Sequence, residues 1–150
     1  MKAKDFMHRN IIIARKDMTL KEAAVRMSDY KVSGLPVIDD EGNLIGIITD
    51  SDILKYRQKI NLPEAMRLIE YFMEEIDPQS IEDNIRSILN EKVKDVMTTR
   101  LITVNEEALL GEIIRKFAEH HISRIPVVRG RKPVGIIARE DVTKIFALKY

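Results

Sequence analysis

The sequence predicts a mixed α/β fold of the α+β type, in which two β-α-β-β-α repeats pack with pseudo-twofold symmetry and a helical hairpin is inserted between them. Three observations support this prediction. The two ends of the 150-residue chain match each other at a spacing of 90 residues. Each half alternates short β-branched runs with apolar stripes of helical period. One unit of about 50–60 residues buries too little apolar surface to be stable alone.

Two matched blocks define the repeat. Ser33-Gly34-Leu35-Pro36-Val37 aligns with Ser123-Arg124-Ile125-Pro126-Val127. After one deletion in the following turn, the block from Gly46 to Asp52 aligns with the block from Gly135 to Asp141. Chance does not easily give two blocks in the same order with a matching apolar pattern between them. The predicted division is a first repeat at 1–56, an inserted segment at 57–90 and a second repeat at 91–150.

The first repeat is predicted to begin with a strand at the β-branched run 11–13. A helix follows, because Thr19 can cap it and Glu22 stands three residues on, as in a capping box. The buried stripe of this helix has helical spacing and consists of Leu20, Ala23, Ala24 and Met27. Two strands, 35–38 and 44–48, flank a turn rich in Asp and form a hairpin. A final helix runs through Ile53, Leu54 and Tyr56.

The second repeat carries the same elements in the same order. The run 101–104 predicts its first strand, and a shorter turn at 129–132 joins its hairpin. Its helical stripe consists of Leu110, Ile113, Ile114 and Phe117.

Residues 57–90 have no counterpart in either repeat and are predicted to form two helices. An apolar face between Leu62 and Ile76 marks the first helix. Asp77 can cap the second, with Pro78 in its favoured first position. We expect the apolar faces to pack on the repeats or on a second subunit; the alternative is a dedicated partner or a lid over a ligand.

Composition excludes several classes of function. The 25 basic and 24 acidic residues give a net charge of +1, which argues against a nucleic-acid binder. The absence of cysteine excludes disulfides, thiolate metal sites and a cysteine nucleophile. No apolar run approaches the roughly 20 residues that span a bilayer, and the N-terminus does not resemble a secretory signal. We therefore expect a cytoplasmic protein with no membrane association.

Motifs of catalysis are also missing from the sequence. It contains no nucleophile elbow and no Walker-type phosphate loop. His120 and His121 are adjacent and would point to different faces of a helix end, so they make a poor metal pair. We expect no catalytic residues, no metal site and no enzyme activity.

The junction from Gly46 to Asp52 has chemistry suited to a small ligand. A strand gives way to a helix here, which places backbone N–H groups and the positive end of the helix dipole at one point and favours an anion. The Thr49 hydroxyl can also donate a hydrogen bond to that anion. The Asp52 carboxylate can accept two hydrogen bonds from a ribose diol. Alternatively, Thr49 and Asp52 only cap the helix. The second copy of the junction favours the ligand interpretation.

These blocks resemble the CBS domain, and two of them in tandem resemble a Bateman module. The resemblance rests on Ser33-Gly34-Leu35-Pro36-Val37 and on Gly46-Ile47-Ile48-Thr49 with Asp52, each followed by its second copy. It covers roughly 110 residues and leaves out the insertion. It implies a regulatory sensor that binds an adenosine-containing ligand in the cleft between the repeats, and a disc-like homodimer. The ligands implied are AMP, ADP, ATP or S-adenosylmethionine.

The resemblance also implies the residues of two ligand sites. In the first, Thr49 and Asp52 take the phosphate and ribose, and the base lies along Ile13, Ser33, Gly34, Leu35 and Pro36. The corresponding residues of the second are Thr103, Ser123, Arg124, Ile125, Pro126, Arg139 and Asp141. Ala138 replaces the threonine there, while Arg131 and Lys132 add positive charge nearby. We expect the second site to be the more favourable one for phosphate.

Two classes of function remain open. The first is a ligand-sensing module that needs no cofactor, binds the adenosine ligand as a regulator and signals through the geometry of a homodimer to a separate effector protein. The second is a structural or dimerisation module whose clefts no longer bind a ligand.

Overall fold

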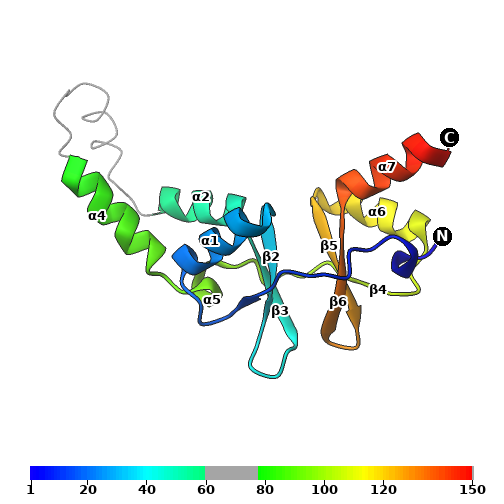
Figure 1. The fold of residues 1–150 in the computed structure, drawn as a ribbon, viewed down its shortest axis with the longest axis horizontal. Coiled ribbons are helices and arrows are strands. Elements are labelled where there is room, and N and C mark those ends of the chain that lie inside the picture. The colour runs from blue at the N-terminus through cyan, green and yellow to red at the C-terminus, as the bar shows by residue number, and fades with distance from the viewer. Residues whose placement is uncertain (60–77, 150) are drawn as a thin grey trace.

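The computed structural model describes residues 1–59 and 78–149. Two three-stranded sheets lie side by side, one from each half of the chain, and helices pack around them (Figure 1). The predicted mixed fold of two β-α-β-β-α repeats with pseudo-twofold symmetry is confirmed. The first helix of the predicted insertion lies outside the described residues.

The first sheet has the strand order β1-β2-β3. Strand β1 is parallel to β2, and β2 is antiparallel to β3. The elements are β1 (Ala14–Arg15), α1 (Leu20–Tyr30), β2 (Gly34–Ile38), β3 (Leu44–Thr49) and α2 (Asp50–Lys59). The second sheet repeats this arrangement as β4-β5-β6. The elements of the second repeat are β4 (Val104–Asn105), α6 (Leu110–His120), β5 (Arg124–Arg129), β6 (Lys132–Ala138) and α7 (Arg139–Lys149).

The first strand of each repeat begins later than the sequence predicted. The run 11–13 belongs to no strand, and pairing starts at Ala14; the run 101–103 likewise precedes β4. β-branched side chains favour any extended backbone, so composition alone does not show where pairing begins. The final helix of the first repeat continues to Lys59, into the segment assigned to the insertion.

Helix α1 shows why this part of the sequence folds as predicted. Thr19 accepts a hydrogen bond from the backbone N–H of Glu22, and the Glu22 carboxylate accepts one from the backbone N–H of Thr19. Leu20, Ala23 and Met27 of the predicted stripe are buried against the first sheet, with Leu35 and Ile48 among their neighbours in the core. The second half has its own core around Ile113, Phe117, Ile125 and Ile137.

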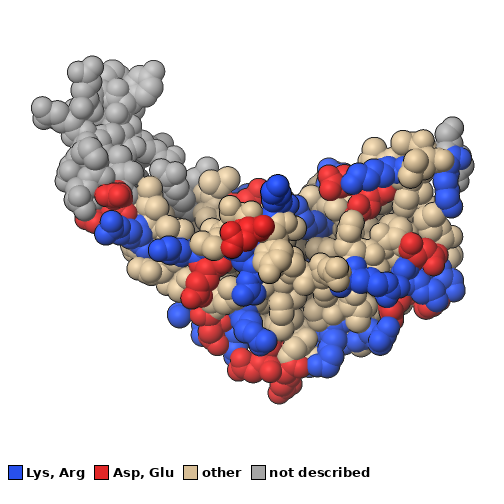
Figure 2. Space-filling view, viewed as in Figure 1, with Lys and Arg blue, Asp and Glu red and all other residues tan. Residues whose placement is uncertain are grey.

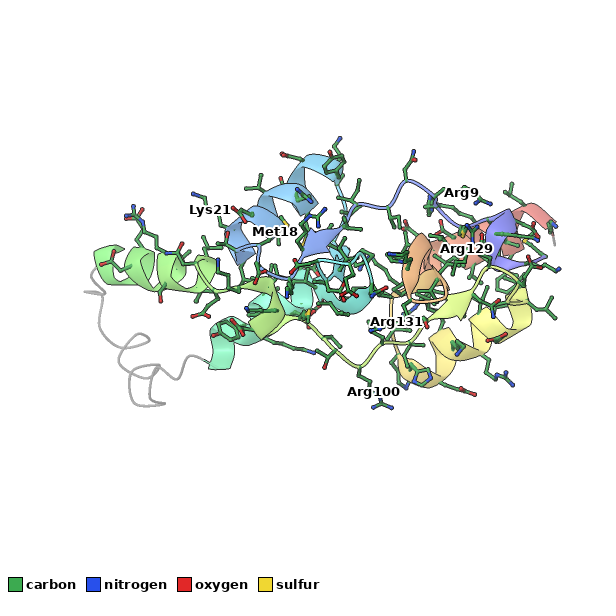
Figure 3. All side chains as sticks on the ribbon, turned by 90° about the horizontal axis from the view of Figure 1, so that it is seen from below. Arg9, Met18, Lys21, Arg100, Arg129 and Arg131 are labelled. Atoms are coloured by element: carbon green, nitrogen blue, oxygen red, sulfur yellow. The ribbon has the colours of Figure 1, made fainter. Side chains whose placement is uncertain are left out.

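Each repeat is completed by a segment that precedes the other repeat. Residues 1–9, which include the short helix η1 (Ala3–Asp5), pack on the second half, where His8 pairs with Ile136. Residues 91–98, which include α5 (Val93–Val96), pack on the first half, where Thr98 pairs with Ile47. We call these two stretches the crossing segments. In Figure 3, Arg9 at the end of the first segment and Arg100, two residues beyond the second, lie at opposite sides of the molecule.

Glycines make room for the crossing segments. A Cβ atom at Gly46 would meet the Met97 side chain and would lie 3.1 Å from the carbonyl oxygen of Thr98. A Cβ atom at Gly135 would meet Met7 in the same way. The two methionines therefore fill equivalent positions against the two sheets.

The second helix of the insertion is present as α4 (Pro78–Leu89). It extends away from the sheets (Figure 1), but Ile88 is buried in the core of the first repeat. This end of the insertion therefore packs on the repeats, one of the two arrangements the sequence suggested.

A salt bridge at the N-terminal crossing segment predicts a measurable titration. Hydrogen bonds from Lys2 and then Lys4 lower the pKa of Glu107 from 4.5 to about 2. A carboxyl whose pKa is lowered on folding stabilises the folded state above its unfolded pKa, and this contribution is lost as the pH falls from about 4.5 to about 2. We expect the Glu107 carboxyl carbon to titrate near pH 2 by NMR. In a Lys2→Gln, Lys4→Gln variant the midpoint should rise toward 4.5; an unchanged midpoint would contradict this cause.

Candidate functional site

In each repeat the middle strand (β2 or β5) starts beside the end of the last strand (β3 or β6). These four strand ends meet between the two repeats. Gly34 at the start of β2 pairs with Thr49 at the end of β3. Arg124 at the start of β5 pairs with Ala138 at the end of β6. The four ends lie where the final helices begin, so the fold brings both matched blocks to the same edge of the molecule.

Thr49 and Asp52 form a helix cap. The Asp52 Oδ2 atom accepts hydrogen bonds from the Thr49 backbone N–H (3.0 Å) and hydroxyl (3.1 Å), and the Asp52 backbone N–H donates to the Thr49 hydroxyl (3.2 Å). The Asp50 N–H donates to the carbonyl of Ser33, and the Ser51 N–H donates to the Asp50 carboxylate. The backbone N–H groups at this junction thus already have protein acceptors.

The equivalent junction of the second repeat has fewer side-chain acceptors for its backbone N–H groups. The Ala138 N–H donates to Asp141 Oδ2 at 2.8 Å, as in the first repeat. Ala138 has no hydroxyl, so the Asp141 backbone N–H lacks the side-chain acceptor that Asp52 has in Thr49. A helix N-terminus with one side-chain acceptor fewer is the more favourable of the two positions for an anion.

A side chain bridges the repeats at this edge. The Arg124 guanidinium donates a hydrogen bond from its Nη2 to the hydroxyl of Ser33. A Cβ atom at Gly34 would lie 3.1 Å from Arg124 Nη1 and 3.1 Å from Thr49 Cγ2. A side chain at position 34 would crowd both groups, so the Arg124 and Thr49 side chains would have to shift by a few tenths of an ångström.

A cavity of about 1180 Å³ opens between the repeats beside this bridge. Its lining combines predicted base-side residues of the first repeat, Ser33, Gly34 and Pro36, with residues of the second repeat around the α7 N-terminus. Those from the second repeat that the sequence singled out are Ser123, Arg124 and Arg139, with Ala138 beside them. The cavity thus brings the residues predicted to hold the base in the first repeat together with the strand-to-helix junction of the second repeat. The sequence did not indicate this combination.

Other predicted site residues lie outside this lining. Leu35 and Ile125 point into the hydrophobic cores and are 0% exposed, and Pro126 is also buried. Ile13 is half-buried, and its carbonyl accepts a hydrogen bond from Arg26 at 2.8 Å. Thr103, Thr49, Asp52 and Asp141 do not line the cavity either.

The cavity also contains residues that the sequence did not single out for a site. Ile11 and Ile12, with Met27 and Val32, make one part of its lining apolar. His8, Tyr30, Lys31 and Glu140 contribute polar or aromatic groups. One signal was available for His8: the 90-residue spacing pairs it with Thr98, another hydrogen-bonding side chain.

Asp141 is held at both oxygens. Its side chain is buried, with the residue 8% exposed. Oδ2 accepts from the Ala138 N–H, and Oδ1 lies 2.9 Å from His8 Nε2. In the first repeat the Thr98 hydroxyl donates to Asp52 Oδ1 at 2.9 Å. The two aspartates have the same arrangement with different donors.

Charge is distributed unevenly around the site. Among the charged residues lining the cavity, Lys31, Arg124 and Arg139 are cationic and Glu140 is anionic. At the opposite edge, the acidic β2–β3 turn lies beside the basic β5–β6 turn (Figure 2), and Lys132 donates to the Glu41 carbonyl. In Figure 3, Arg129 and Arg131 mark this basic turn.

The part of the chain that the structure describes contains neither a metal-binding cluster nor a membrane-spanning helix. Within 1–59 and 78–149, no group of three or more His, Cys, Asp or Glu side chains is placed to hold a metal ion. None of the helices described there has the length and apolar character needed to cross a bilayer.

Two αβ repeats with crossing segments and a cavity between them define a tandem-repeat domain pair. The chain belongs to the CBS domain family, whose model matches residues 3–59 and 93–148. These bounds coincide closely with the two repeats, so the resemblance seen in the sequence is confirmed.

Three relatives illustrate the similarity. The uncharacterised protein MJ1404 of Methanocaldococcus jannaschii is 32% identical over 97% of this chain, which spans only 32% of that longer protein. The uncharacterised protein YlbB of Bacillus subtilis is 29% identical over 95% of this chain and 80% of its own length. The crystal structure of the CBS domain pair of protein MJ0100, in complex with 5′-methylthioadenosine and S-adenosyl-L-methionine, is 26% identical with a TM-score of 0.74. That alignment covers 100% of this chain and 98% of the other.

Proposed function

We propose that this CBS domain pair is a regulatory module that binds an adenosine-containing ligand in the cavity between its repeats. The observation that carries the proposal is the cavity itself, because it unites the Ser33–Pro36 block with the helix junction at Ala138 and Arg139. Its volume of about 1180 Å³ is ample for a nucleotide. A similar domain pair, that of MJ0100, holds adenosine compounds.

The charges favour an anionic ligand at this cavity. Arg124 and Arg139 line it near the start of α7, where the Asp141 N–H lacks a side-chain acceptor. Arginine guanidinium groups and helix N-termini both favour phosphate oxygens. The apolar lining around Ile11 and Ile12 suits an adenine base. We infer that AMP, ADP or ATP is preferred to the sulfonium cation of S-adenosylmethionine.

Signalling would pass from the cavity to the arrangement of the repeats. Arg124 bonds Ser33 across the repeats. A phosphate that recruits Arg124 would compete with this bond. A ligand shifts an equilibrium between two arrangements only by its preference for one of them. The shift would change the geometry of a homodimer, and a separate effector protein would respond to it. Val25 and Leu54 are exposed apolar side chains that a homodimer interface could cover.

The alternative is a structural or dimerisation module without a ligand. It is favoured by the helix-capping bonds of Asp52 and Asp141, which serve the fold without any ligand. Because both alternatives use the same residues in the free protein, only binding distinguishes them.

A thermal-shift series tests the proposed function. With AMP at 100 times its dissociation constant, the folded state should gain about 2.7 kcal/mol, which raises the melting temperature by several degrees. AMP, ADP, ATP, adenosine and S-adenosylmethionine would be compared at equal concentration, with CMP as the control for a ribose phosphate that lacks adenine. No shift with any adenosine compound would contradict ligand sensing and favour the structural module.

A further inference from the structure

We propose that the contact between the β2–β3 turn and the β5–β6 turn is the pivot of this domain pair. The two repeats stay joined there, through residues 39–44 and 129–132, while the edge that holds the cavity opens or closes around a ligand. We call this contact the turn contact. The inference rests on the proposed function, because a ligand in the cavity drives the motion, and it adds the place about which the repeats rotate.

The two turns lie at the ends of the hairpins that face away from the cavity. The first hairpin begins at the cavity with Gly34 paired to Thr49 and ends at the turn with Ile38 paired to Leu44. Figure 1 shows both turns on the side of the sheets opposite helices α2 and α7. The turns are therefore separated from the cavity by the length of the strands.

The turn contact is made mostly by backbone atoms. The Leu44 N–H of the first repeat donates to the Arg131 carbonyl of the second at 2.8 Å. The Lys132 ammonium donates to the Glu41 carbonyl at 2.6 Å. A Cβ atom at Gly42 would lie 3.3 Å from Lys132 Nζ, so the first turn fits closely around this ammonium. Only one side chain takes part in these two bonds, and little torsional freedom is left for one turn to shift against the other.

The first turn is closed on itself by hydrogen bonds. The N–H groups of Glu41 and Asn43 both donate to the Asp39 carboxylate at 2.9 Å. The Asp39 N–H donates to the Asn43 carbonyl at 2.9 Å. This turn therefore moves together with β2 and β3.

The second turn is held by its own repeat in the same way. Arg129 pairs with Lys132, which leaves a loop of only two residues, Gly130 and Arg131. The Arg129 guanidinium donates to the Glu106 carboxylate at 2.7 and 2.8 Å. This turn therefore moves together with β5 and β6.

Opposite charges face each other across the turn contact (Figure 2). The backbone N–H of Asn43 is the main cause that lowers the pKa of Asp39, and the charge of Arg131 lowers it further. Asp39 is therefore ionised opposite a basic turn. The sequence suggested Arg131 and Lys132 as charges near the second ligand site, but the structure places both at the turn.

The cavity edge is joined by a flexible side chain instead. The Arg124 guanidinium donates to the Ser33 hydroxyl beside the cavity of about 1180 Å³. A long side chain can follow its partner over a range of separations, or leave it for a ligand phosphate. When two rigid bodies are joined by backbone bonds at one edge and enclose a cavity at the other, their relative motion is a rotation about the joined edge.

Two pairs of spin labels test the pivot, because the chain has no cysteine and introduced cysteines are its only labelling sites. The turn pair, Asp40→Cys with Arg131→Cys, replaces no side chain that bonds across the turn contact. The α2–α7 pair, Lys55→Cys with Lys144→Cys, uses equivalent exposed positions of the two final helices. Double electron–electron resonance measures both distances with and without AMP, in labelled protein diluted with unlabelled protein so that only distances within one chain contribute. Calorimetry measures AMP binding to each labelled protein and to the wild type.

We expect AMP to change the mean distance of the α2–α7 pair by about 2 Å or more and to leave that of the turn pair unchanged. Lys132→Glu places a carboxylate against the acidic turn in place of the donor. It should broaden the distances of the turn pair and speed hydrogen exchange of the Leu44 amide by about tenfold, as for the loss of one hydrogen bond. Arg115→Glu makes the same change of charge at an exposed position of α6 and should alter neither. Should Lys132→Glu not fold, Lys132→Met, which only removes the ammonium, gives the same comparison.

Three results would overturn the pivot while leaving ligand binding intact. They are a change in the turn pair as large as that in the α2–α7 pair, bound AMP with no movement of either pair, and an unchanged exchange rate of the Leu44 amide in Lys132→Glu. A wild-type protein that does not bind AMP would instead refute the proposed function, and the ligand-driven rotation with it.

Discussion

Replacing Gly46 with valine is expected to destabilise the protein by about 3 kcal/mol, the largest effect we predict for a single change outside the hydrophobic cores. A Cβ atom at this position would meet the Met97 side chain and would lie 3.1 Å from the Thr98 carbonyl oxygen. Backbone on one side and a buried sheet on the other leave little room for adjustment. Urea unfolding followed by circular dichroism would measure the loss.

Gly111 provides the matched control. A Cβ atom there would meet nothing within 4 Å, and the residue lies in helix α6. Gly111→Ala should therefore leave stability unchanged or raise it by up to about 1 kcal/mol. Shortening Met97 to alanine in the Gly46→Val background should recover part of the loss, because the two sites are in contact and their effects do not add. Equal stability of Gly46→Val and the wild type would contradict the close packing of the crossing segment.

Asp141→Ala is expected to weaken AMP binding by tenfold or more, and Asp52→Ala to weaken it less. The Asp141 carboxylate adjoins the junction that lines the cavity, and hydrogen bonds to a charged acceptor contribute about 1.5–3 kcal/mol each. Asp52 belongs to the junction whose backbone N–H groups already have acceptors. Calorimetric titration with AMP, ATP and S-adenosylmethionine would measure both variants.

The folded state of these variants has to be checked before binding is compared. Each substitution removes a helix-capping acceptor, at a cost of about 1 kcal/mol, so both proteins should remain folded with similar losses in stability. Similar stability with different affinity would support an asymmetric pair of sites. Equal losses of affinity in both variants, for every ligand, would contradict the asymmetry.

The features predicted correctly from sequence are those that depend on local chemistry or on comparison of the chain with itself. The capping box of Thr19 and Glu22 forms as expected, because its donors and acceptors lie within one turn. The repeat and its hairpins follow from matched blocks. The paths of residues 1–9 and 91–98 were not predicted, since these short segments have no periodic pattern and their contacts are distant in sequence.

The cavity was likewise predicted only in part from the sequence. The matched blocks identified Ser33, Gly34, Arg124 and Arg139, all of which line it. Sequence equivalence relates Ala138 to Thr49, but it does not say which strand start faces which helix junction. That pairing depends on how the two repeats pack. His8 reaches Asp141 across 133 positions in the chain, a contact that no local pattern indicates.

The crossing segments have a consequence for synthesis on the ribosome. The first repeat cannot complete its outer sheet edge until Thr98 has emerged, although its own strands end at Thr49. Residues 1–9 are made first but find their partners last, since Ile136 and Asp141 lie near the end of the chain. Domains generally fold as units during translation, N-terminal first. Here neither half is a unit by itself, so we expect a nascent chain stalled after residue 60 to remain open to protease.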